Sequence, residues 1–73
     1  MKQPSTLLNF GTRLKMLRAA RGCSQETMAA DIGLDRTYYA AVENGKRNVS
    51  LKNIKKIAVG FRLSLSELFS EVR

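Results

Sequence analysis

The chain has 73 residues, 44% of them apolar, with 13 Lys and Arg against 6 Asp and Glu, a formal charge of +7, no His and one Cys. This length allows one domain, whose folding buries only about 60% of the surface of the unfolded chain. A disulfide framework and a structural zinc site are excluded, because both need several Cys or His side chains. No apolar run approaches the roughly 18 to 20 residues that cross a bilayer, and the start "MKQPST" lacks the apolar segment of a signal peptide. A cytoplasmic protein is therefore expected.

The positive charge is large for so small a body and is unevenly distributed. Residues 1–21 hold five cations and no acid, whereas residues 22–35 hold three acids and no cation. A strong positive field attracts polyanions, so composition favours a nucleic acid as partner. The alternative is that the net charge only keeps a small domain soluble.

The first predicted elements are a flexible lead and an amphipathic helix. Residues 1–5 contain a proline and are mostly polar, which favours a flexible lead. Phe10, Leu14 and Leu17 then recur at spacings of three and four, which predicts a helix, and Gly22 is its predicted stop.

Two short helices are predicted next, joined by a turn of only three residues. The first is capped by Ser24 and ends at Gly33, and the second is capped by Asp35 and runs to residues 44–45. The first of them is too short to be stable alone. The inner faces are expected to carry Met28, Ala29 and Ile32 from the first helix, and Tyr39 and Val42 from the second.

Two more helices complete the prediction. Ser50 can cap one whose apolar stripe lies opposite several cations. The stripe consists of Leu51, Ile54, Ile57, Ala58 and Phe61. The "SLSE" at 64–67 matches a capping box, in which Ser64 and Glu67 reciprocate, and it starts a short last helix. Five helices and no strand predict an all-α fold, a compact five-helix domain with a helix-turn-helix over residues 6–73.

The two short helices and their glycine turn predict a DNA-reading element. Such helices can bury their inner faces against a third and leave the first turn of the second projecting, a shape that fits the major groove. The base-reading side chains would be Arg36, Thr37, Tyr38 and Ala41. Arg36 can donate two hydrogen bonds to guanine, and Thr37 can contact a base edge or a thymine methyl. The alternative is that Arg36 is only a solvated cation on a helix surface.

Polar side chains around this helix have the donors needed to hold phosphate oxygens, a contact that fixes register without reading sequence. The predicted backbone contacts are Gln25 at the start of the first short helix, Lys46, Arg47 and Asn48 after the second, and Asn53 in the fourth predicted helix. For "GKRN" alone, a charged turn is the alternative.

The stretch "FGTRLKMLRAARGCSQETMAADIGLDRTYYAAVENGKRNVSLKNIKKIA", with "LSLSELF" after it, resembles the Cro and phage-repressor helix-turn-helix family, often called XRE-type, over residues 10–69. Within that family, "LDRTY" followed by "GKRN" is most similar to the small controller proteins of restriction-modification operons. The resemblance implies the base-facing and backbone roles given above. It also implies a structural ion pair between Arg18 and Glu43, for which the alternative is two unpaired exposed charges.

Three positions depart from the pattern of this family. Tyr39 stands where relatives usually carry Ile or Val, so the helix must accept a ring and find a partner for its hydroxyl. Arg62 stands where many relatives have glycine, which leaves the end of the fourth helix undefined. Cys23 lies in the turn between the first two helices and is interpreted as a packed thiol rather than a redox sensor, because the chain has no second Cys.

One helix contacting about four base pairs rarely gives both affinity and specificity, so a homodimer on a palindromic operator is expected, with half-sites about 10 base pairs apart. The fourth and fifth helices are predicted to supply the interface, with Leu65, Phe69 and Val72 pointing outward. The alternative is that these side chains close the monomer core. Repression, activation and a contact with RNA polymerase all stay open.

The expected function is therefore that of a sequence-specific regulator of transcription that binds double-stranded DNA. An enzyme is not expected, because the composition offers no visible combination of a catalytic nucleophile with a general base. No cofactor, metal, membrane contact or small-molecule effector is predicted. An antitoxin-like or phage-type adaptor that mainly binds a protein partner is the alternative function. RNA also stays open as a ligand, because phosphate charge does not separate the two nucleic acids.

Overall fold

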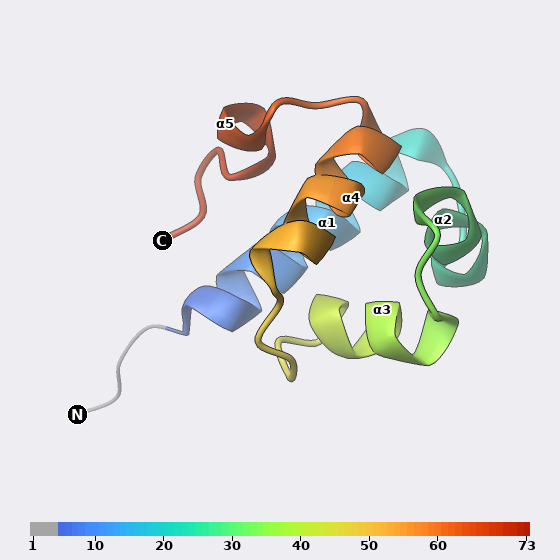
Figure 1. Ribbon diagram of the computed structural model, residues 1–73. Coiled ribbons are helices and arrows are strands. Elements are labelled where there is room, and N and C mark those ends of the chain that lie inside the picture. The colour runs from blue at the N-terminus through green and yellow to red at the C-terminus, as the bar shows by residue number, and fades with distance from the viewer. Residues whose placement is uncertain (1–4) are drawn as a thin grey trace.

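The computed structural model describes residues 5–73 (Figure 1). Within this range the chain forms five helices and no strand, as the sequence predicted. The helices are α1 (Thr6–Arg21), α2 (Gln25–Ile32), α3 (Arg36–Glu43), α4 (Leu51–Phe61) and α5 (Leu65–Leu68). Figure 1 shows α3 at the bottom of the view and α5 at the top, with α4 between them. Of residues 5–73, no helix combines the length and apolar character needed to cross a membrane.

Each helix begins at a side chain that accepts a hydrogen bond from the amide three residues on. The five caps are Ser5, Ser24, Asp35, Ser50 and Ser64, with donor–acceptor distances of 3.0 to 3.2 Å. The Ser64 N–H also donates to Oε1 of Glu67 at 2.8 Å, which completes the predicted capping box. Each such cap contributes about 1 kcal/mol, a large share of the stability of an eight-residue helix such as α2 or α3. The predicted lead falls on residues 1–4, which lie outside the described residues, and on Ser5, which caps α1.

One hydrophobic core joins all five helices. Its buried members are Phe10, Leu14, Met28, Ala29, Ile32, Tyr39, Val42, Ile57, Ala58, Phe61 and Leu68. The predicted inner faces of α2 and α3 are confirmed. The prediction for Leu51 is wrong, because this side chain is 73% exposed. Side chains in a helix tilt toward its N-terminus, so the first residue of α4 projects beyond the core. Ile54 is half-buried, and the fully buried part of the stripe starts at Ile57.

Two backbone positions decide how the helices meet and end. Gly11 is buried in α1 at a point where an added β-carbon would overlap the carbonyl oxygen of Glu43, so only glycine lets α1 lie this close to α3. Arg62 ends α4 in the left-handed conformation, with φ 59° and ψ 40°. The next amide, of Leu63, donates to the carbonyl oxygen of Ala58 at 2.9 Å. The end of α4 is thus a cap of the kind that glycine usually makes, built with an arginine.

Candidate nucleic-acid interface

The turn between α2 and α3 sets the direction of α3. Gly33 ends α2 with a φ of 87°, a conformation that side-chain-bearing residues rarely adopt. Asp35 then caps α3 by accepting the Tyr38 N–H at 3.0 Å. Arg36 and Thr37, the two residues that follow the cap, are both exposed. The structure therefore leaves these two predicted base-reading side chains accessible at the start of α3.

Arg36 has one weak partner. Its Nη1 lies 4.0 Å from Oε1 of Glu26 in α2, and the two side chains are 66% and 74% exposed. An exposed pair at this distance contributes about 0 to 1 kcal/mol, so the guanidinium can exchange this partner for another. Glu26 was not among the predicted site residues, because a contact between two different helices leaves no spacing signal in the sequence.

A buried network holds the other end of α3. Glu43 is 1% exposed and accepts two hydrogen bonds from Arg18, Nε to Oε2 at 2.7 Å and Nη2 to Oε1 at 3.0 Å. The Nε2 of Gln25 also donates to Oε1 of Glu43, at 3.0 Å. Arg18 uses its Nη1 to donate to the carbonyl oxygen of Cys23 at 3.0 Å. The network ties α1 to both α2 and α3, so the helix-turn-helix is fixed as one unit.

The two charges of this network stabilise one another. Burial alone would raise the pKa of Glu43, but the hydrogen bonds from Arg18 and Gln25 outweigh burial and hold that pKa below its ordinary value of 4.5. The hydrogen bond to Glu43 likewise raises the pKa of Arg18. Gln25, predicted to contact the DNA backbone, is half-buried, and its amide group donates to Glu43 in this structure.

Tyr39 is the unusual member of the inner face of α3. Its ring is fully buried in the core, so the helix does accept an aromatic residue here. Its hydroxyl lies near the Glu43 carboxylate, yet it has no hydrogen-bond partner among the described residues. Burial, and then the carboxylate, raise the pKa of Tyr39, which keeps the phenol neutral. The partner that we expected for this hydroxyl is thus not found within residues 5–73.

Three of the predicted DNA-contacting residues form one cluster. The Nδ2 of Asn53 in α4 donates to the hydroxyl of Tyr38 in α3 at 3.1 Å. The guanidinium carbon of Arg47, from the loop between these helices, lies 4.9 Å from the centre of the Tyr38 ring. Tyr38 and Asn53 are half-buried, whereas Arg47 is exposed. A cation over an aromatic face is attracted to it, so the Tyr38 ring is a platform that orients Arg47 beside α3.

The remaining predicted contacts lie around this cluster. Lys46 and Asn48 flank Arg47 in the loop, and both are exposed. The Lys46 N–H donates to the carbonyl oxygen of Ala41 at 2.9 Å, which fixes the direction in which the loop leaves α3. Ala41 itself is half-buried, so its methyl group offers only a small apolar surface.

The three residues predicted for a dimer interface differ in exposure. Leu65 is 37% exposed, whereas Phe69 and Val72 are half-buried. Phe69 stacks on Phe10, with the ring centroids 5.2 Å apart. Phe69 therefore helps to close the monomer core, and Leu65 offers the freest apolar surface of the three.

Two further kinds of site come into question from the sequence, a metal site and a reactive thiol. Across residues 5–73, no cluster of three or more His, Cys, Asp or Glu side chains could hold a metal ion. Cys23 is half-buried, and its Sγ lies 3.7 Å from the sulfur of Met28. This environment is that of a packed thiol, the interpretation that the sequence favoured.

Comparisons with known proteins match most of the chain. The model of the helix-turn-helix family matches residues 14–68. Control protein C.MunI from Mycoplasma sp is 56% identical over 66 residues, which are 89% of this chain and 89% of that protein. The crystal structure of the restriction-modification controller protein C.AhdI from Aeromonas hydrophila has a TM-score of 0.85 at 52% identity, over 90% of this chain and 100% of the other.

A further solved structure shows a protein of this kind on DNA. The restriction-modification controller protein C.Esp1396I, a tetramer in complex with its natural 35 base-pair operator, has a TM-score of 0.85 at 28% identity, over 96% of this chain and 92% of the other. The resemblance drawn from residues 10–69 is therefore confirmed. The chain belongs to the helix-turn-helix family and, within it, is similar to the controller proteins of restriction-modification systems.

Proposed function

We propose that this protein is a transcriptional regulator that binds a palindromic operator in double-stranded DNA as a homodimer and controls a restriction-modification operon. The observation that carries the proposal is the state of α3, whose first residues, Arg36 and Thr37, are exposed while its last residue, Glu43, is locked in a buried ion pair. A helix that reads bases needs both an accessible start and a fixed orientation. The names of its relatives, control protein C.MunI and the operator-bound C.Esp1396I, support the same function.

Two groups of side chains would have different roles in DNA binding. Arg36, Thr37, Tyr38 and Ala41 would face the bases. Gln25, Lys46, Arg47, Asn48 and Asn53 would hold the phosphates on either side. The Tyr38 platform adds a coupling between these groups, because it touches both Arg47 and Asn53. Moving Tyr38 against a base would therefore also move two backbone contacts.

Residues 6–73 would act as one domain, in the cytoplasm, without enzymatic activity. A dimer bound beside a promoter is placed to contact RNA polymerase, and the position of the operator then decides between repression and activation. An adaptor that mainly binds another protein is less well supported, since the relatives that the chain matches are named as control proteins and one of them is solved on its operator.

The dimer is proposed to form through α4 and α5. Leu65 supplies exposed apolar surface, and Phe69 and Val72 supply the edges that the core leaves open. Leu65→Lys should shift the protein toward monomer in analytical ultracentrifugation and weaken operator binding. Met16→Lys is the matched control, because Met16 is a 60% exposed residue of α1 and its replacement should leave the dimer intact. Equal dissociation in both variants would place the interface elsewhere.

The experiment that tests the function is selection of bound duplexes from a randomised DNA pool at physiological salt. The wild type should enrich an inverted repeat with half-sites about 10 base pairs apart. The Arg36→Ala, Thr37→Ala double variant should lose this enrichment, whereas Lys15→Ala, which removes an exposed cation of α1, should keep it. Binding without any enriched sequence in the wild type would show that α3 does not read bases and would favour the adaptor.

A further inference from the structure

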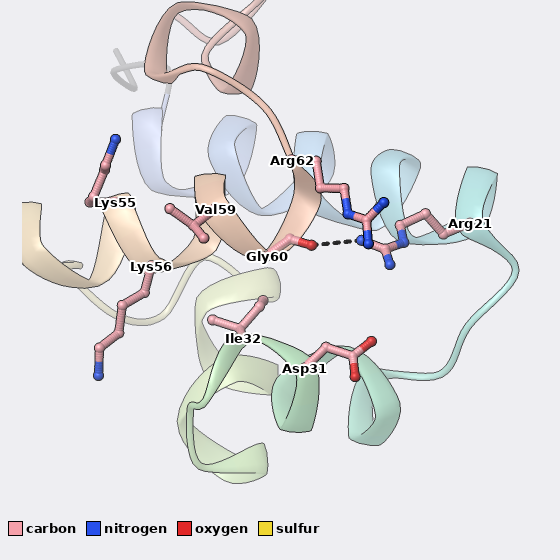
Figure 2. Close-up of a pocket in the computed structure, with 8 residues that line it drawn as sticks. All are labelled: Arg21, Asp31, Ile32, Lys55, Lys56, Val59, Gly60 and Arg62. Carbon is pink, nitrogen blue, oxygen red and sulfur yellow. Dashed lines mark hydrogen bonds between the residues drawn. The ribbon is translucent and has the colours of Figure 1, made fainter.

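A cavity of about 540 Å³ lies away from α3, between α1, α2 and α4 (Figure 2). Its lining comes from the last residue of α1, the end of α2, the middle and end of α4 and the residue that follows α4. The volume falls within the range of about 300 to 1,000 Å³ that is typical of small-molecule sites. The cavity shares none of the residues proposed to contact operator DNA, so it requires its own explanation.

The charges around the cavity are unbalanced. Four cations, Arg21, Lys55, Lys56 and Arg62, line it together with one acid, Asp31. Within residues 5–73, no salt bridge joins any of these cations to a carboxylate. Figure 2 shows the side chains of Arg21 and Arg62 pointing toward one another, with Asp31 on the opposite wall. Two guanidinium groups that share one cavity repel each other, and an anion between them would remove that repulsion.

The left-handed cap that ends α4 also determines where the Arg62 side chain lies. Arg62 has a φ of 59°, in the left-handed region that glycine adopts without strain and other residues adopt rarely. Strain of this kind is often kept at binding sites. At this position it carries a guanidinium into the cavity, which a glycine could not supply.

Arg21 shows how one wall is held. Its Nη1 donates to the carbonyl oxygen of Gly60 at 2.7 Å, and its guanidinium lies 5.9 Å from the centre of the Phe61 ring. These contacts fix the group at the end of α4 and leave its other nitrogen atoms for a ligand. A simpler explanation is that the cations only offset the negative ends of α1 and α4, and the experiment must separate the two.

We propose that this cavity binds a small polyphosphate anion, a nucleoside triphosphate being the form that fits best. The phosphates would lie between Arg21 and Arg62, with Lys55 and Lys56 at the rim. Val59, which is 61% exposed, supplies most of the apolar surface of this lining, because Ile32 is only 8% exposed, and that surface suits a base or ribose rather than bare phosphate. Arg is well suited to such a site, because its planar group donates two parallel hydrogen bonds to one phosphate.

The test is isothermal titration of the full chain with ATP and with inorganic tripolyphosphate at physiological salt. The wild type should bind both saturably, and ATP more tightly because of the apolar surface of Val59. Arg62→Gly should lose about tenfold or more in affinity for each, since it removes a charge-assisted contact. The same variant relieves the left-handed strain, so thermal unfolding should show it to be at least as stable as the wild type. Lost binding would then not reflect lost folding.

Lys52→Gln is the matched control. Lys52 is an exposed cation of α4 outside the cavity, so this variant removes the same charge and should bind ATP as the wild type does. Absence of saturable binding in the wild type would overturn the proposal. So would an equal loss of affinity in both variants, which would indicate a general charge effect. A third contrary result is weaker operator binding by Arg62→Gly with no binding of ATP, which would assign the cavity to DNA phosphate.

Discussion

Two arginine–glutamate pairs in this small domain have opposite characters. Arg18 and Glu43 meet at 2.7 Å, with the carboxylate fully buried, whereas Arg36 and Glu26 meet at 4.0 Å with both side chains largely exposed. Both pairs link α2 or α3 to another helix of the domain. The residue types are the same, so the surroundings decide whether an arginine stabilises the fold or stays available for a ligand.

Breaking the buried pair should have the largest effect. Glu43→Ala leaves the Arg18 guanidinium without its partner and removes the acceptor of Gln25, so the free energy of unfolding should fall by about 3 kcal/mol. Urea titration followed by circular dichroism measures this change. Glu26→Ala is the control for the exposed pair and should change the same quantity by no more than about 0.5 kcal/mol. Similar losses in the two variants would contradict the contrast between the pairs.

Removing the exposed arginine should act on DNA binding rather than on folding. Arg36→Ala should weaken binding to the preferred operator by about 1 to 3 kcal/mol and relax the preference at one base pair. Its unfolding free energy should stay close to that of the wild type, because the group is 66% exposed.

Arg47→Ala is the comparison variant for this experiment. It should weaken binding to all sequences alike, since phosphate contacts carry no sequence information. Fluorescence anisotropy with operator and scrambled duplexes distinguishes the two patterns. If Arg36→Ala lowered affinity equally for every sequence, Arg36 would be a backbone contact and not a base reader.

Lowering the pH should destabilise the fold by a smaller amount, and it should act through the buried pair. The pKa of Glu43 is lowered on folding, so its contribution to stability is present above the unfolded value of 4.5 and is lost as pH falls through the lower folded value. The wild type should therefore lose stability below about pH 4.5. Glu43→Gln should flatten this part of the pH profile, because glutamine has no side-chain group that binds a proton in this pH range.

Glu67 is the control for this profile. Its pKa is also lowered, by hydrogen bonds from the Ser64 backbone and hydroxyl groups, but its carboxylate lies at the surface. Glu67→Gln should therefore leave most of the acid-dependent loss in place. If Glu67→Gln flattened the profile and Glu43→Gln did not, the buried pair would not be the main source of acid sensitivity.

The features that the sequence predicted are those encoded locally. Ser24, Asp35, Ser50 and Ser64 cap their helices because a side chain needs only an amide three residues away, a spacing visible in the sequence. The exposure of Leu51 was missed, because it depends on where the core ends in space and not on helical period.

The contacts that organise the site are not local. Residue types alone gave no reason to pair Arg18 with Glu43, and that pair came from the family resemblance. The contacts of Tyr38 with Arg47 and Asn53, and of Arg36 with Glu26, join separate elements, so their geometry had to come from the structure. The sequence therefore supplied candidate site residues and, through the resemblance, one of their contacts, whereas the contacts of Tyr38 and of Arg36 came from the structure.

The smallest expected effect concerns the acid partner of the exposed pair, and it rests on the proposed function. Glu26→Gln keeps the shape of the side chain but removes a negative charge 4.0 Å from the guanidinium of Arg36. Arg36 then has no ion pair to break before it contacts a base, so the free energy of operator binding should become more favourable by up to about 1 kcal/mol. This gain should be smaller at high salt, because salt screens the pair. Glu71→Gln, which changes an exposed acid near the end of the chain, controls for net charge. Anisotropy titrations at two salt concentrations would measure both. A fall in affinity would mean that Glu26 orients the Arg36 side chain for its contact with a base. The weak pair would then assist base recognition instead of competing with DNA for Arg36.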